Sequence, residues 1–121
     1  MYWGYHLILD CGSCNPISIR SAETITRFAK HLVNDIDMVA FGEPTVVHFG
    51  TGNKAGFTLV QLIETSNICA HFVEETNDIY LDVFSCKPFN PSDVENIIND
   101  YFSPQRINKI FLNRQAYKNI L

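Results

Sequence analysis

The sequence lacks any apolar run that approaches the roughly eighteen residues needed for a membrane-spanning helix. Its first residues, Met1 to Gly4, also lack the basic and apolar segments of a signal peptide, so we expect a cytoplasmic protein. Basic residues are scarce as well: nine Lys and Arg stand against thirteen Asp and Glu, which gives a formal net charge of −4. A nucleic acid or an anionic membrane would find no compensating basic surface, so we expect neither as a partner. A cationic small molecule suits this charge better.

Cysteines are few, and their spacing does not complete a metal site. Cys11 and Cys14 have CxxC spacing, but no second pair or nearby histidine would complete a zinc site. In the cytoplasm the four cysteines are expected to be thiols, so we expect no metal and no disulfide. What the chain does have is 46% apolar and 18% charged residues over 121 positions. This is typical of one folded domain, residues 1–121, whose core needs no covalent support.

Hydrophobic patterning predicts six strands and two helices. Alternating or β-branched apolar runs indicate the strands, and apolar residues at helical spacing after the caps Ser21 and Asn90 indicate the helices. The predicted strands are 5–9, 45–49, 57–64, 67–73, 79–86 and 106–112. This order predicts an α+β fold, a two-layer α/β sandwich in which two helices cover one face of a mainly antiparallel sheet. His6 shares a strand face with Ile8, and we expect it to face the core.

The stretch from Glu64 to Cys86 and the strand before it hold the most reactive side chains. Residues two apart on a strand share a face, so if these runs pair as neighbouring antiparallel strands, four side chains can meet at one end of the sheet. They are Thr58, Ser66, His71 and Cys86. Taken alone, each has a simpler explanation, as a turn residue, a core histidine or a buried cysteine. Together, a hydroxyl, an imidazole and a thiol predict a chemical site.

This stretch resembles the prokaryotic S-adenosylmethionine decarboxylases, small pyruvoyl-dependent enzymes of polyamine (spermidine) synthesis that are made as proenzymes. The family pattern has a Glu-Ser pair at the cut, a His five residues later, an acidic residue four beyond that, and an Asp-x-Phe-(Thr/Ser)-Cys strand end. The residues that match without a gap are Ser66, His71, Glu75 and Asp82-Val83-Phe84-Ser85-Cys86. A weaker resemblance extends over nearly the whole chain.

The resemblance implies a self-cleaving proenzyme. Ser66 would attack the carbonyl of Thr65 and become a covalent pyruvoyl group, a ketone that serves as the electron sink for decarboxylating an α-amino acid. During processing His71 would be the base or donor and Thr58 an assisting hydroxyl, and in turnover Cys86 would return a proton to the decarboxylated carbon. The candidate substrate contacts are Glu75 and Glu64. The resemblance also implies a homodimer.

Other functions stay open at the level of sequence. Asn67 stands where the family usually has His, residues 72–74 replace Thr-Trp-Pro, and the glycine-rich loop 50–56 replaces an aromatic and Pro-rich segment. We expect this loop to line the substrate pocket. A pocket so altered need not hold an adenosyl group, so a pyruvoyl-dependent decarboxylase of arginine or ornithine is one alternative. The others are a non-processing homologue that acts as a partner subunit, and a hydrolase that uses Cys86 with His71.

Overall fold

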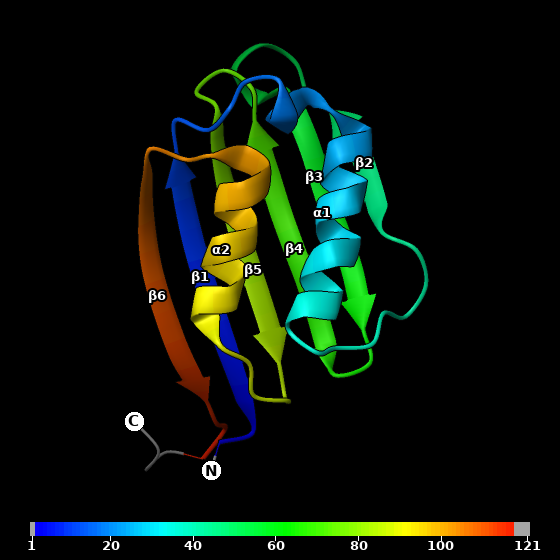
Figure 1. Ribbon diagram of the computed structural model, residues 1–121, viewed down its shortest axis with the longest axis vertical. Helices are drawn as coiled ribbons and strands as arrows, with labels where there is room; N and C mark the ends of the chain where they lie inside the picture. The colour runs from blue at the N-terminus through cyan, green and yellow to red at the C-terminus, as the bar shows by residue number, and fades with distance from the viewer. Residues whose placement is uncertain (1, 118–121) are drawn as a thin grey trace.

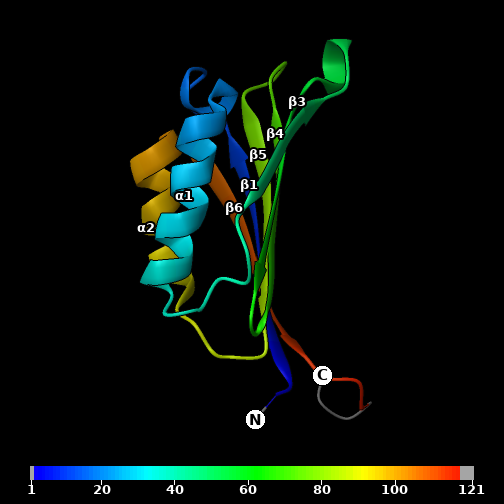
Figure 2. The ribbon, with the colours of Figure 1, turned by 90° about the vertical axis from the view of Figure 1, so that its right-hand side faces the viewer.

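The computed structural model describes residues 2–117, in which one six-stranded antiparallel sheet carries two α-helices on one face (Figures 1 and 2). The strands lie side by side in the order β2-β3-β4-β5-β1-β6. Their bounds are β1 (Gly4–Gly12), β2 (Thr45–Phe49), β3 (Gly56–Ile63), β4 (Ser66–Val73), β5 (Asp78–Ser85) and β6 (Arg106–Arg114). The helices are α1 (Ala22–Asp35) and α2 (Pro91–Phe102), and two short 3-10 turns are η1 (Ser18–Arg20) and η2 (Gly52–Lys54). The predicted α+β sandwich is confirmed.

Both helices begin where the predicted capping residues lie. The Ser21 hydroxyl accepts the Thr24 N–H, and the Asn90 side chain accepts the Ser92 N–H, with Pro91 as the first helical residue. The buried residues of the helices are Ile25, Phe28, Ala29, Leu32 and Val33 in α1 and Val94, Ile97, Ile98 and Phe102 in α2. Among the described residues, neither helix is long and apolar enough to cross a membrane.

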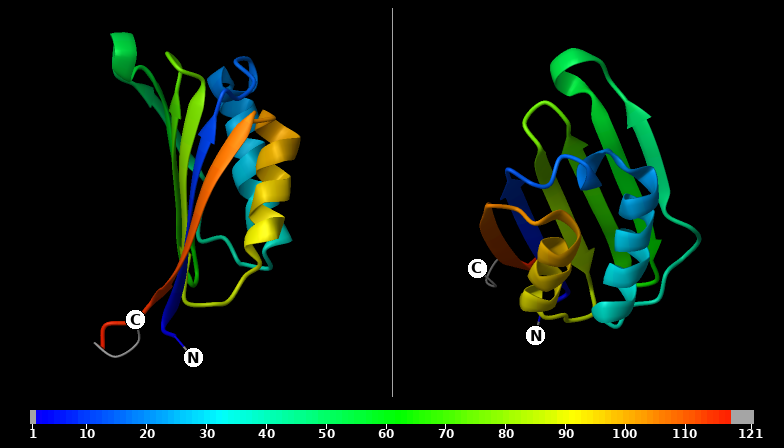
Figure 3. Two further views of the ribbon diagram at one scale, coloured as in Figure 1. Left: turned by 90° about the vertical axis from the view of Figure 1, so that its left-hand side faces the viewer. Right: turned by 45° about the horizontal axis from the view of Figure 1, so that its top comes forward.

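The two faces of the sheet differ in what covers them. Figure 3 shows α1 and α2 together on one side, where they bury alternate apolar strand residues such as Leu9, Leu59 and Leu81. We call the other side the open face. It carries Ile8, Thr58, Val60, Leu62, Cys69, His71, Tyr80, Asp82, Phe84, Ile110 and Leu112. Leu62 is 50% exposed and Ile110 is 54% exposed, so the open face presents apolar surface that is suited to burial against another molecule.

His6 does not face the core, so that prediction is wrong. The odd-numbered residues Leu7 and Leu9 of β1 are fully buried on the helix side, and His6 therefore lies on the open face. The Arg114 side chain lies 3.0 Å from His6 Nδ1, and the Asp82 carboxylate lies 3.0 Å from Nε2. Because arginine can only donate, Nδ1 accepts, and the ring proton sits on Nε2 and is donated to Asp82. His6 thus links β6 to β5 across β1.

Candidate functional site

A hydroxyl and an imidazole meet on the open face of the β3–β4 hairpin. Thr58 and His71 are directly opposite in the antiparallel pairing, and Thr58 Oγ1 lies 3.1 Å from His71 Nδ1. They line a cavity of about 380 Å³ together with Glu75 and two residues of the β2–β3 loop, Asn53 and Lys54. Figure 2 shows this loop extending past the end of the sheet. Of the four side chains expected to meet, Thr58 and His71 are therefore in contact.

The bond before Ser66 lies at the opposite end of these strands. Glu64 and Thr65 form the tight turn between β3 and β4, and Ser66 is the first residue of β4. Ser66 pairs with Ser85, the last residue of β5, so Cys86 comes next to the turn. The Cys86 N–H donates to the Thr65 carbonyl oxygen at 3.1 Å. The carbonyl of the proposed cut therefore already has a hydrogen-bond donor.

Within one chain the four predicted residues form two groups, so the prediction that they meet at one end of the sheet is wrong. His71 lies five residues after Ser66 on β4, which is roughly 16 Å at the rise of a strand. Five is an odd number, so alternation places Ser66 on the helix side, with buried Ile68, and His71 on the open face. Thr58 accompanies His71, and Cys86 accompanies Ser66.

The two glutamates divide between these groups. Glu75 is exposed and lines the cavity of His71, whereas Glu64 is exposed in the turn beside Ser66. A carboxylate therefore stands at each end of the β3–β4 hairpin.

Burial separates Cys86 from the other thiols. Cys86 is exposed, whereas Cys11 and Cys14 are buried. Burial raises the pKa of the Cys11 thiol to about 12 and that of the Cys14 thiol to about 11, because desolvation disfavours the thiolate. Burial also raises the pKa of Cys69, with a further contribution from the nearby Asp82 carboxylate. Cys86 is the thiol best placed to meet a ligand.

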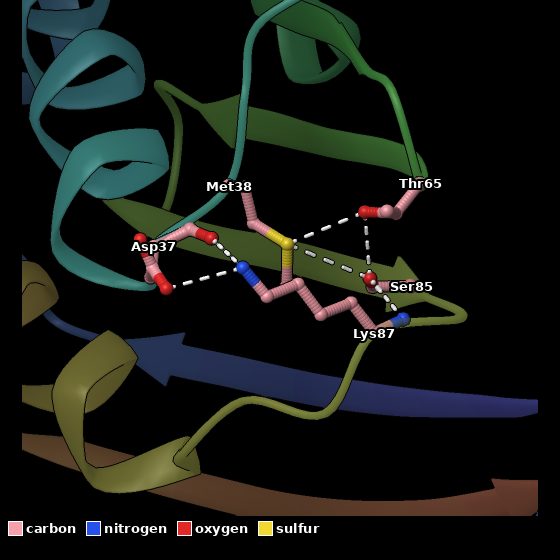
Figure 4. Close-up of polar contacts among 5 residues, drawn as sticks. All are labelled: Asp37, Met38, Thr65, Ser85 and Lys87. Carbon is pink, nitrogen blue, oxygen red and sulfur yellow. Dashed lines mark hydrogen bonds and ion pairs between the residues drawn. The ribbon is translucent and has the colours of Figure 1, made fainter.

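A polar cluster around Thr65 was not predicted from the sequence (Figure 4). The Ser85 hydroxyl donates to Thr65 Oγ1 at 2.9 Å and accepts the Lys87 N–H at 2.9 Å. The Thr65 hydroxyl donates to Met38 Sδ at 3.3 Å. The Lys87 ammonium contacts both the backbone carbonyl and the carboxylate of Asp37. One signal was available: Ser85 continues the alternation of buried residues in β5 where an apolar residue would be ordinary.

Comparison with known proteins gives consistent results. Residues 5–115 match the sequence profile of the family described as S-adenosylmethionine decarboxylase. An S-adenosylmethionine decarboxylase proenzyme of Clostridium botulinum strain Hall is 30% identical over 103 residues, which are 80% of this chain and 85% of that protein. The proenzyme of strain Langeland is 29% identical over 85 residues, 70% of each chain.

A solved structure has the same fold. The adenosylmethionine decarboxylase of Aquifex aeolicus superimposes with a TM-score of 0.80 at 22% identity, over 98% of this chain and 95% of that one. The likeness extends over all six strands and both helices of the described residues.

Proposed function

Because this chain belongs to the S-adenosylmethionine decarboxylase family, we propose that it is a proenzyme that breaks its own backbone between Thr65 and Ser66 and decarboxylates S-adenosylmethionine with the pyruvoyl group so formed. The observation that carries the self-cleavage is the hydrogen bond from the Cys86 N–H to the Thr65 carbonyl oxygen. It places a donor at the oxygen that must become negative when the bond breaks.

The cleavage begins when Ser66 Oγ attacks the Thr65 carbonyl carbon. The carbonyl oxygen then takes negative charge, and losing one donor to such an oxyanion typically costs about 3–4 kcal/mol. The C–N bond breaks, the Ser66 nitrogen takes the proton that the Ser66 hydroxyl loses, and the amide becomes an ester. A base then takes the Ser66 Cα proton, the Cβ–Oγ bond breaks, and Thr65 leaves as a carboxylate. The enamine that remains at residue 66 takes a proton on Cβ and becomes an imine. Water adds to the imine carbon and ammonia leaves, so that a ketone is left at residue 66 of the new chain 66–121.

The separation of His71 from Ser66 supports a homodimer. A single chain holds the Thr58–His71 pair roughly 16 Å along β4 from the bond that breaks. A second copy packed on the open face would bury Leu62 and Ile110, which are half-exposed in one chain. In a dimer with two-fold symmetry, the same surface of both copies forms the interface. Each contact between a residue of one copy and a residue of the other therefore occurs twice. In such a dimer the partner's His71 serves Ser66 of this chain, which requires the half-buried Ser66 side chain, next to the turn, to rotate from the helix side toward the interface.

The remaining residues suit turnover of a cationic substrate. A pyruvoyl carbonyl at residue 66 supplies the electron sink that loss of carbon dioxide from an α-amino acid requires. Cys86 is exposed beside residue 66, where its thiol can hold the proton that returns to the decarboxylated carbon. Glu64, near Ser66, and Glu75, near His71, can contact the hydroxyl or cationic groups of the substrate.

The alternatives are less well supported. The Clostridium botulinum and Aquifex aeolicus proteins above are all adenosylmethionine decarboxylases, which favours that substrate over arginine or ornithine. A partner subunit would have no use for a donor at the Thr65 carbonyl or for the Thr58–His71 pair. A hydrolase that uses Cys86 with His71 is disfavoured, because the two lie in different groups within one chain.

Release of carbon dioxide from carboxyl-labelled substrates tests this function. We expect release from S-adenosylmethionine, and release from arginine and ornithine slower by roughly a hundredfold or more, because those substrates leave the groups that recognise the adenosyl moiety without partners. A Ser66→Ala preparation, purified in the same way, gives the background from host enzymes. Release above this background from arginine or ornithine alone would assign the chain to the alternative substrate. No release from any of the three would contradict a decarboxylase.

A further inference from the structure

We propose that Ser85 is a positioning residue for the self-cleavage, because it fixes Thr65, the residue whose carbonyl is attacked. This inference rests on the proposed function. Thr65 is held by two consecutive residues at the end of β5: the Ser85 hydroxyl donates to Thr65 Oγ1 at 2.9 Å, and the Cys86 N–H donates to the Thr65 carbonyl oxygen at 3.1 Å. Figure 4 shows the first of these two contacts, between the side chains of Ser85 and Thr65.

The hydrogen bonds around Ser85 run in one direction. A serine hydroxyl has a single proton, and the Lys87 N–H already occupies one acceptor site of Ser85 Oγ at 2.9 Å. The Ser85 proton therefore points to Thr65 Oγ1, at 2.9 Å, in preference to the Met38 sulfur, at 3.6 Å. The Thr65 proton in turn points to Met38 Sδ. Both hydroxyl protons in this series of hydrogen bonds, those of Ser85 and Thr65, therefore have a defined acceptor.

The burial of Ser85 stabilises this arrangement. Its residue is 0% exposed, and a buried hydroxyl cannot exchange its protein partners for water without a cost. The Lys87 ammonium in addition contacts the carbonyl and the carboxylate of Asp37, in the loop after α1, through an ion pair that is exposed to solvent. The end of β5 thus connects the turn at Thr65 to the loop that follows α1.

A fixed Thr65 is what the first covalent step requires. Ser66 Oγ must approach the Thr65 carbonyl carbon to about 3–3.5 Å along a defined direction, and a misplacement of about 1 Å can slow a reaction by about a hundredfold. Rotation of Thr65 would also withdraw its carbonyl oxygen from the Cys86 N–H. The family pattern has Glu before the cleaved Ser, whereas the Thr65 hydroxyl of this chain both accepts from Ser85 and donates to Met38.

The rate of self-cleavage tests the role of Ser85. The chain is synthesised in a cell-free translation system with a radioactive amino acid, and conversion into two fragments is followed on denaturing gels. We expect Ser85→Ala and Thr65→Val to slow cleavage between about tenfold and a hundredfold. We expect Ser85→Thr and Thr65→Ser, which keep the hydroxyls, to cleave within about threefold of the wild-type rate. Because the two residues form one contact, the double variant is expected to be no slower than the slower single variant.

Each outcome decides the proposal. Cleavage of Ser85→Ala at the wild-type rate would overturn the role of Ser85 and leave the proposed function intact, whereas an uncut wild-type chain would overturn both. Equal slowing of Ser85→Ala and Ser85→Thr would indicate packing instead of the hydroxyl and would also overturn the role. Circular dichroism and thermal unfolding check that each variant folds. If Ser85→Ala does not fold, the comparison of Thr65→Val with Thr65→Ser decides, because Thr65 is only half-buried.

Discussion

Replacing Ser66 by alanine is expected to leave the chain as a single uncut polypeptide without decarboxylase activity. The methyl group of alanine has no oxygen to attack the Thr65 carbonyl, so no ester forms and no ketone is made. The fold should survive, because Ser66 is half-buried at the start of β4 and no hydrogen bond within the core depends on its side chain among the described residues. The measurement is a denaturing gel together with carbon dioxide release from S-adenosylmethionine.

The matched control is Ser92→Ala on α2. Ser92 is exposed, and its backbone N–H, not its hydroxyl, takes part in the cap of the helix. This variant should cleave and decarboxylate as the wild-type chain does. A Ser66→Ala chain that still separated into fragments at residue 65 would refute the assignment of Ser66 as the nucleophile.

Two inactive variants are expected to restore activity when they are made together. Ser66→Ala removes the nucleophile, and His71→Ala removes the imidazole that we place across the dimer interface. In a mixed dimer, one of the two sites combines the intact Ser66 of one copy with the partner's intact His71. Half of randomly mixed dimers are mixed and each has one whole site, so co-expression should give roughly a quarter of wild-type activity.

A site contained within one chain gives a different result. In that case each site of a mixed dimer carries one of the two substitutions, and co-expression leaves the preparation inactive. Such a result would contradict the shared site, although it would leave Ser66→Ala as a test of cleavage. The control is co-expression of Ser66→Ala with Ser66→Ala,His71→Ala, in which every site lacks the nucleophile and no activity is expected.

The local features of this protein could be predicted from its sequence. The strand Thr45–Phe49 has the predicted bounds, and the helix caps Ser21 and Asn90 have the predicted hydrogen bonds, because alternation and capping depend on neighbours in the sequence. The pairing of Thr58 with His71 also follows from two strands joined by a short turn. These features require no knowledge of distant parts of the chain.

Features that depend on the whole sheet were harder to predict. The face that His6 takes is one of them, because alternation defines two faces of a strand without identifying which one the helices cover. The odd spacing of Ser66 and His71, by contrast, predicts from the sequence alone that they lie on opposite faces of β4. The alternation of β5 indicates that Ser85 is buried, but it does not identify Met38 as a neighbour, because the loop after α1 brings Met38 to the end of β5 from 47 residues away in the sequence.

The mass of the purified wild-type protein under denaturing conditions tests the central claim most directly. Self-cleavage with ketone formation predicts two chains, residues 1–65 ending in a carboxylate and residues 66–121 beginning with a pyruvoyl group. Together they should have the mass of the full chain plus one water minus one ammonia. A single species with the mass of the full chain, or two fragments in which the second retains serine and its nitrogen at residue 66, would contradict a protein that makes its own ketone.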